Sequence, residues 1–133
     1  MLKIIKPSVA GKNNSSIGGN VPAFFGINDV NSGSVSINMS LKSLPAKQKT
    51  QPHYHSNCEE AMYVISGKAT IYHGADLKPE EVSAEEFVYV PKNEIHQLEN
   101  KSDAIPFVVI QAQTAPSEQA AGYVFLSEKD LLR

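Results

Sequence analysis

The chain has 133 residues, 41% of them hydrophobic, which is enough for one domain with a buried core. Its 12 basic and 14 acidic residues nearly cancel, so it lacks the positive charge typical of nucleic-acid-binding proteins. A single cysteine excludes an intramolecular disulfide, and no apolar run is long enough for a signal sequence or a membrane span. We therefore expect a cytoplasmic protein that binds neither nucleic acid nor membranes.

The N-terminal part of the chain carries little regular patterning. Residues 3–5 (KII) are a short strand candidate. Residues 11–20 (GKNNSSIGGN) are rich in glycine, asparagine and serine, which predicts a flexible loop. Phe24 and Phe25 form an apolar patch that would either contact a second copy of the chain or close one end of a barrel.

Strand patterns begin at about residue 35. Residues 35–42 alternate strictly, and the period of two predicts a strand that buries Val35, Ile37, Met39 and Leu41. The segments AMYVIS (61–66) and KATIYH (68–73) predict two strands joined as a hairpin at Gly67.

Further short strands follow an acidic segment, residues 74–86, that reads as a loop. The remaining strand candidates are FVYV (87–90), IHQLEN (95–100), IPFVVIQA (105–112) and GYVFL (122–126). Only SEKDLLR at the C-terminus predicts a helical turn, with Ser127 as its N-cap. Such spacing indicates an all-β sandwich or barrel, which we treat as one domain of residues 1–133 with an extension at 1–29 and a core barrel at about 30–126.

Two of the four histidines, His53 and His55, are separated by one residue. On a strand they point to the same face, so both imidazoles can reach one ion. Glu60 can join them if residues 56–59 form a turn that resets the alternation, and Met62 and Val64 then continue its inward face. Glu59 has the parity of an uninterrupted strand and is the competing candidate.

His96 begins a later strand and is the candidate for the fourth ligand. Three imidazoles and one carboxylate suit one divalent ion such as Fe, Mn, Ni, Zn or Cu, and leave coordination positions open for water or substrate. Burying these groups without a metal would be costly, which favours the metal site over a set of satisfied core residues. His73 has no paired donor near it in sequence and is assigned to the surface.

These residues resemble the two motifs of the cupin family. The first motif is His-x-His, three or four residues, Glu, six residues and Gly, which matches His53, His55, Glu60 and Gly67. The second ends in Pro-x-Gly, two residues, His, three residues and Asn, which matches Pro91, His96 and Asn100 except for the glycine. The resemblance implies a double-stranded β-helix, or jelly-roll barrel, with a metal held by three histidines and one glutamate. It also favours a homodimer.

The chain departs from the family pattern at three glycine positions. Lys47, Glu85 and Asn93 stand where the family has glycine. Asparagine adopts left-handed backbone geometry more readily than most residues, so Asn93 is a mild change. Lys47 and Glu85 predict turns of a different shape.

Several residues near the motifs are candidates for contact with a small-molecule substrate: Gln51, Cys58, Met62, Val64, Leu98 and Asn100. A Cys58 thiolate near the metal could react, although a small packed turn residue is the plainer interpretation. The expected function, from the resemblance, is an oxygen-dependent metalloenzyme similar to the dioxygenases. The alternatives are a redox-neutral isomerase, cyclase or lyase, for which Glu60, Tyr54, Tyr63 or Tyr89 would carry protons, and a binding protein for a small ligand or sugar.

Overall fold

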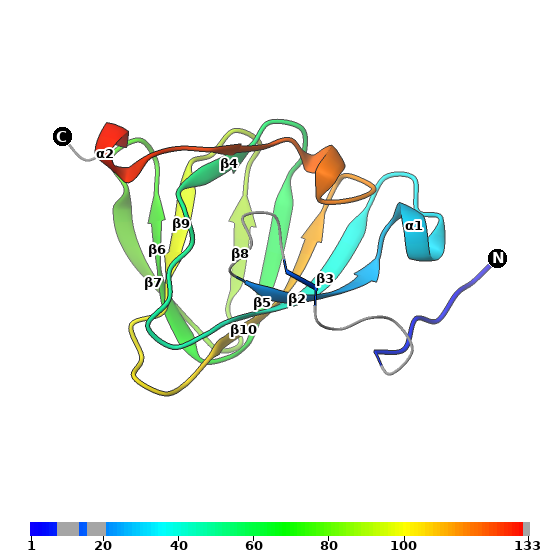
Figure 1. The fold of residues 1–133 in the computed structure, drawn as a ribbon, viewed down its shortest axis with the longest axis horizontal. Coiled ribbons are helices and arrows are strands. Elements are labelled where there is room, and N and C mark those ends of the chain that lie inside the picture. The colour runs from blue at the N-terminus through cyan, green and yellow to red at the C-terminus, as the bar shows by residue number, and fades with distance from the viewer. Residues whose placement is uncertain (8–13, 16–20, 132–133) are drawn as a thin grey trace.

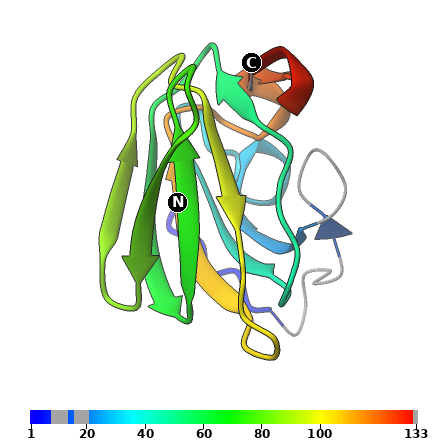
Figure 2. The same ribbon diagram turned by 90° about the vertical axis from the view of Figure 1, so that its left-hand side faces the viewer.

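Two antiparallel sheets face each other and enclose the interior of the protein (Figure 1, Figure 2). The computed structural model describes residues 1–7, 14–15 and 21–131. The predicted flexible loop at 11–20 lies, except for Asn14 and Ser15, outside the described residues. The all-β prediction is confirmed. Within the described part of the chain, no helix is long and apolar enough to cross a membrane.

The larger sheet has six strands in the order β1-β2-β3-β10-β5-β8. Their bounds are β1 Asn14–Ser15, β2 Pro22–Ile27, β3 Asn38–Leu44, β10 Phe107–Gln113, β5 Glu60–Ser66 and β8 Phe87–Val90. The second sheet has five strands in the order β11-β4-β9-β6-β7. Their bounds are β11 Tyr123–Phe125, β4 His53–His55, β9 His96–Glu99, β6 Lys68–His73 and β7 Lys78–Ser83.

In the described part of the chain, three short helical segments connect or follow the strands. They are α1 Asp29–Ser32, the 3-10 turn η1 Gln119–Ala121 and α2 Glu128–Leu131. The predicted C-terminal turn is α2, and the Ser127 hydroxyl accepts a hydrogen bond from the Lys129 backbone N–H at 3.2 Å. The sequence did not suggest α1, which Asn28 caps through its side chain.

The predicted hairpin between β5 and β6 is wrong, because the two strands belong to different sheets. Gly67 lies between them with φ of 82°, and the chain passes there from one sheet to the other. A Cβ at this position would lie 2.3 Å from the Pro106 carbonyl oxygen. The turn therefore requires glycine both for its left-handed backbone and for the close approach of the neighbouring loop.

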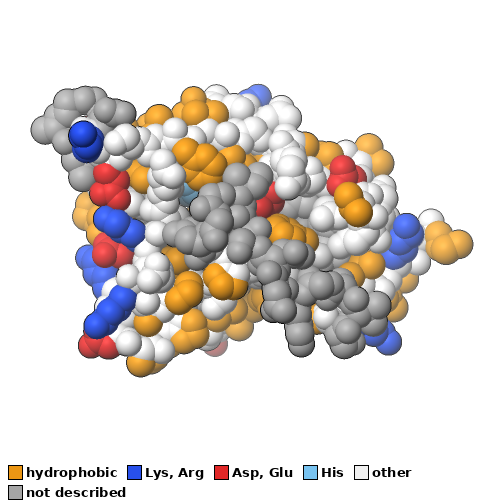
Figure 3. Space-filling view, viewed as in Figure 1, with side chains coloured by type: hydrophobic (Ala, Val, Ile, Leu, Met, Phe, Trp, Pro, Cys, Tyr) orange, Lys and Arg blue, Asp and Glu red, His pale blue; other side chains and the backbone are white. Residues whose placement is uncertain are grey.

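Two further expectations from the sequence are also wrong. Residues 3–5 do not form a strand. Within the acidic segment assigned to a loop, residues 78–83 form β7, which pairs along its whole length with β6. β7 is the edge strand of its sheet, and edge strands tolerate proline and charge, here Pro79 and Glu80. Charged side chains gather on that side of the molecule (Figure 3).

The face of β3 that is buried is the opposite of the predicted one. Asn38, Ser40 and Lys42 point inward and are at most 7% exposed. Met39 and Leu41 point outward and are 46% and 41% exposed. The alternation correctly predicts which residues share a face, but the polar face lines the interior.

The outer surface of the six-stranded sheet is consequently apolar across several strands. Cross-strand register joins one row of side chains from β2 to β8, which are Phe24, Leu41, Ile110, Tyr63 and Phe87. A second row joins Ile27, Met39, Ala112, Ala61 and Tyr89. None of these side chains is fully buried, and Phe87 is 80% exposed. We call these ten residues the outer apolar face.

All three positions where the family has glycine adopt left-handed backbone geometry. The φ angles are 62° at Lys47, 73° at Glu85 and 68° at Asn93. These turns therefore have a backbone geometry that glycine adopts readily, contrary to the expectation of differently shaped turns at Lys47 and Glu85. In this geometry the Cβ atoms of Lys47 and Glu85 crowd the backbone, which destabilises the turns relative to glycine.

We expect Lys47→Gly to be more stable than Lys47→Ala by about 1 kcal/mol, because glycine removes the clash of Cβ in left-handed geometry and alanine keeps it. Both variants lose the exposed ion pair of Lys47 with Asp103, so that loss cancels in the comparison. Urea unfolding of the two variants measures the difference. Equal stabilities, or a more stable alanine variant, would show that this turn carries no backbone strain.

Candidate metal centre and pocket

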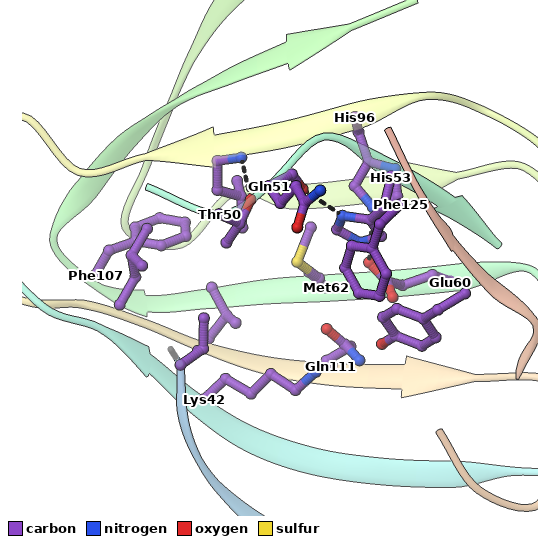
Figure 4. A pocket seen from close by; sticks show the side chains of 15 residues that line it. Lys42, Thr50, Gln51, His53, Glu60, Met62, His96, Phe107, Gln111 and Phe125 are labelled. Carbon is purple, nitrogen blue, oxygen red and sulfur yellow. Dashed lines mark hydrogen bonds and ion pairs between the residues drawn. The ribbon is translucent and has the colours of Figure 1, made fainter. Parts of the chain in front are cut away.

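Three histidines converge on one point inside the barrel. His53 and His55 come from β4, and His96 on the neighbouring strand β9 stands directly opposite His53. Their nearest ring nitrogens all lie within 4.8 Å of one another. The ring centroids of His53 and His96 are 4.3 Å apart, and Figure 4 shows these two rings side by side at one end of the pocket.

Backbone carbonyl groups fix the orientation of two of these rings. The Nδ1 atom of His53 lies 2.9 Å from the Gln51 carbonyl oxygen, and the Nδ1 atom of His96 lies 2.9 Å from that of Glu94. A carbonyl oxygen can only accept, so both Nδ1 atoms donate a proton. In a neutral ring the Nε2 atom then carries a lone pair, which is the form that binds a metal.

The surroundings of the His55 ring show whether these residues fit a metal ion. Its side chain is 1% exposed, yet neither ring nitrogen has a hydrogen-bond partner. Its Nε2 atom lies 3.7 Å from Oε1 of Glu60, beyond hydrogen-bonding distance. A buried imidazole without partners costs free energy, and a metal ion between His55 and Glu60 would give its Nε2 atom a partner and so reduce that cost. The donor set therefore fits a metal ion.

Glu60 reaches the centre because the chain turns between β4 and β5. Its carboxylate is 3% exposed, with Oε2 4.0 Å from Nε2 of His96. Oε1 accepts a hydrogen bond of 2.9 Å from the Gln113 amide, which holds the carboxylate in place. Glu59 points to the outside, where it accepts a hydrogen bond from the Tyr89 hydroxyl. Of the two candidates, Glu60 is the one that borders the histidines.

Burial keeps His53 and His55 neutral. Desolvation lowers the pKa of His55 to about 4, and it lowers the pKa of His53 well below the usual 6.5. Neutral rings are the state in which imidazole ligates a metal. The site is therefore prepared for metal binding at neutral pH.

We expect the metal-free protein to lose stability as the pH falls from about 6.5 to about 4. In this window the unfolded chain protonates His55 and the folded chain does not, so the proton favours unfolding by roughly 2 to 3 kcal/mol. Glutamine cannot take up this proton, so the free energy of unfolding of His55→Gln should change less with pH. Urea unfolding of EDTA-treated protein at several pH values measures both slopes. Identical slopes would exclude His55 as the group responsible.

A cavity of about 190 Å³ extends from the histidines between the two sheets. His53, Glu60 and His96 form part of its wall (Figure 4). Tyr123 and Phe125 of β11 also line it, with ring centroids 5.3 Å and 5.5 Å from that of His53. The apolar part of its lining is formed by Val21, Leu44, Met62, Leu98, Phe107 and Val109.

Three of the six candidate substrate residues line this pocket, namely Gln51, Met62 and Leu98. The other three are not among its lining residues. Val64 is fully buried in the hydrophobic core. The Asn100 amide donates to the carbonyl groups of Leu44 and Ile105, which secures a loop.

Cys58 packs in a small apolar cluster with Ala115 and Ala121. Burial raises the pKa of its thiol to about 11, so the reactive thiolate is scarce at neutral pH. This environment favours the interpretation of Cys58 as a packed turn residue. Tyr54, Tyr63 and Tyr89 are also absent from the pocket lining.

Sequence reasoning missed a chain of buried polar residues beside the centre. The Lys42 ammonium group forms a buried ion pair with Glu118. The Tyr123 hydroxyl donates to Glu118 at 3.1 Å and accepts from the Gln113 amide at 2.9 Å. Gln113 in turn donates to Glu60. The only signal in the sequence is the pair of glutamines, Gln111 and Gln113, alternating with apolar residues on one face of β10.

A sequence model described as the cupin domain matches residues 40–112. The chain belongs to the cupin family. No curated protein sequence matches this cupin significantly.

Comparison with solved structures supports the same fold. The polyketide cyclase RemF from Streptomyces resistomycificus is 19% identical, with a TM-score of 0.75 over 98% of this chain and 91% of that one. A double-stranded β-helix protein from Klebsiella pneumoniae is 16% identical, with a TM-score of 0.66 over 94% and 92% of the two chains. A variant of oxalate decarboxylase from Bacillus subtilis is 27% identical, with a TM-score of 0.65 over 84% of this cupin but only 29% of its own chain. These similarities establish the double-stranded β-helix.

Proposed function

We propose that this cupin is an enzyme that holds one divalent metal ion through His53, His55, Glu60 and His96 and acts on a small organic molecule in the adjoining pocket. The observation that supports this most directly is the unpartnered, buried ring of His55 next to Glu60 and to two histidines whose Nδ1 atoms each lie 2.9 Å from a backbone carbonyl oxygen. The bound ion would supply a Lewis acid or a binding position for oxygen.

Within this function, the pocket wall favours redox-neutral chemistry such as isomerisation, cyclisation or lyase activity. Such reactions need groups that hold and move protons. Lys42 lines the pocket, and its ion pair with Glu118 continues through Tyr123 and Gln113 to Glu60. These residues can retain a proton next to the substrate without admitting bulk water. An oxygen-dependent oxidoreductase remains the second candidate, which the donor set of three histidines and one carboxylate supports.

Reconstitution of the metal-free protein with Fe, Mn, Ni, Zn or Cu under anaerobic conditions, followed by assays against a panel of small carbonyl compounds and acids, tests the function. Product formation without oxygen supports the redox-neutral class. Turnover that requires and consumes oxygen supports the oxidoreductase. Binding without turnover by any metal form would reject the enzyme and leave a ligand-binding cupin.

We also propose that two copies of this cupin pair through the outer apolar face. An uncharged apolar face can pack on a copy of itself about a two-fold axis, which charged faces cannot do without matched partners. The face contains no ionisable group other than the tyrosines, and its residues run in register across five strands.

We expect Phe87→Glu and Leu41→Glu to convert a dimer into a monomer, because either change buries an unpaired carboxylate in the interface. Sedimentation equilibrium measures the oligomeric state. Val30→Glu is a matched control, because Val30 is 90% exposed on α1 and lies outside the outer apolar face. A wild-type protein that stays monomeric at high concentration would reject this interface.

A further inference from the structure

The pocket contains a polar contact point that is separate from the candidate metal ligands. The inner faces of β3 and β10 supply it. Val109 pairs with Lys42 and Gln111 pairs with Ser40, so Lys42 and Gln111 are diagonal neighbours on the inner side of the sheet. Figure 4 shows the Lys42 side chain running along the pocket toward the Gln111 amide, with His53, Glu60 and His96 on the other side.

Gln111 has an unused donor in this wall. The residue is 5% exposed and lines the pocket, and its Nε2 atom has no hydrogen-bond partner. Buried amide groups in folded proteins nearly always have partners, so an orphaned one at a cavity points to a ligand atom that accepts from it. Its neighbour on β10, Gln113, differs in that both ends of its amide are occupied.

Lys42 strengthens this contact point without adding net charge. Its ammonium group has three N–H donors, and the ion pair with Glu118 uses one of them. Because the charge of Lys42 is balanced by Glu118, the site offers donors and no net positive charge. A neutral oxygen acceptor suits it better than an anion, which would also meet the nearby Glu60 carboxylate.

The rest of the pocket limits the body of the ligand. The surface beyond Lys42 is formed by apolar side chains, among them Leu44, Phe107 and Val109. The cavity of about 190 Å³ is close in size to an apolar cavity known to accommodate one benzene ring. The volume therefore suits a ligand body of about one ring.

We propose that Gln111 and Lys42 bind the carbonyl oxygen of a small ligand whose remaining part is apolar and about the size of one ring. This assignment deepens the proposed function, since it concerns the same pocket. It names a carbonyl compound as the substrate class. The carbonyl contact itself does not require a metal, so the two ideas can be tested apart.

An NMR titration of the metal-free, full-length protein with acetophenone, ethylbenzene and benzoate tests the proposal. Acetophenone and ethylbenzene have similar shapes but only the first has a carbonyl oxygen. We expect acetophenone to bind at least about tenfold more tightly than ethylbenzene, because only a carbonyl satisfies the buried donors. Benzoate should bind more weakly than acetophenone. Equal binding of acetophenone and ethylbenzene, or tighter binding of benzoate, would overturn the assignment.

Gln111→Leu should weaken acetophenone binding about tenfold and leave ethylbenzene binding unchanged or improved. Gln51→Leu is the matched control, because Gln51 also lines the pocket but its amide already donates to the Leu126 carbonyl group. It should leave the preference for acetophenone intact. Loss of the preference in Gln51→Leu but not in Gln111→Leu would overturn the proposal.

The metal content of the same samples separates this proposal from the proposed function. Gln111→Leu should retain the metal of the wild-type protein. If the protein prefers acetophenone but takes up no metal, the carbonyl site is supported and the proposal of a metalloenzyme is rejected. If the protein takes up metal but does not prefer acetophenone to ethylbenzene, only the proposal of the carbonyl site is rejected.

Discussion

His96→Ala should abolish stoichiometric metal binding, lowering metal affinity by more than about 100-fold. Even residues that only orient a metal ligand change affinity by 10- to 100-fold, so removal of a ligand should exceed that range. Elemental analysis of the purified protein and of protein reconstituted with Zn or Mn gives the metal content. The wild-type protein should carry about one ion per chain.

His73→Ala is the matched control for this experiment. His73 pairs with His96 across β6 and β9, yet its side chain is 34% exposed, lies near Glu80 and Glu94, and is not among the three whose ring nitrogens converge. It should retain full metal content. Equal, substoichiometric metal in the wild-type protein and in His96→Ala would remove the basis of the metalloenzyme.

The second large effect concerns the ion pair between Lys42 and Glu118. Lys42→Met should lower the free energy of unfolding by about 3–5 kcal/mol, because it removes one partner of the ion pair with the Glu118 carboxylate, which is 2% exposed. Glu118→Gln should be destabilising for the complementary reason, while keeping an acceptor for the Tyr123 hydroxyl.

The double variant Lys42→Met/Glu118→Gln should recover most of this loss, since no buried charge is left unbalanced. Urea unfolding of all four proteins completes the cycle. Additive losses in the double variant would mean that the two groups act independently. They would also weaken the case for a proton-retaining chain beside the pocket.

The residues that converge at the candidate centre were predictable because their arrangement follows from local geometry. A period of two places His53 and His55 on one face, and the polar residues between β4 and β5 allow the turn that brings Glu60 inside. His96, which begins a later strand and matches the second motif of the family, lies opposite His53 in the structure. Their role as metal ligands stays a prediction.

The face of β3 was not predictable, because alternation alone does not tell which side of a strand is buried. Apolar residues normally mark the inner side, but here Lys42 and Asn38 are inside. Their partners, Glu118 and Gln113, lie more than 70 positions later in the chain. Only the folded structure shows that these distant groups compensate one another.

The assignment of strands to sheets was missed for a related reason. A tight turn at Gly67 is compatible either with a hairpin or with a passage between sheets, and the contact with Pro106 that decides between them is remote in sequence. The left-handed turns at Lys47 and Glu85 carry no local signal either, because these residues rarely adopt such geometry.

The pairing of β4 with β11 has a consequence for biosynthesis. His53 and His55 lie beside Phe125 and Tyr123, so the strand that carries two of the candidate ligands gains a neighbour on this side only after the ribosome has added some 70 further residues. At the proposed metal site, ion capture should therefore be a late event that follows translation of β11. A nascent chain halted before Tyr123 would expose its imidazoles to the solvent of the cell.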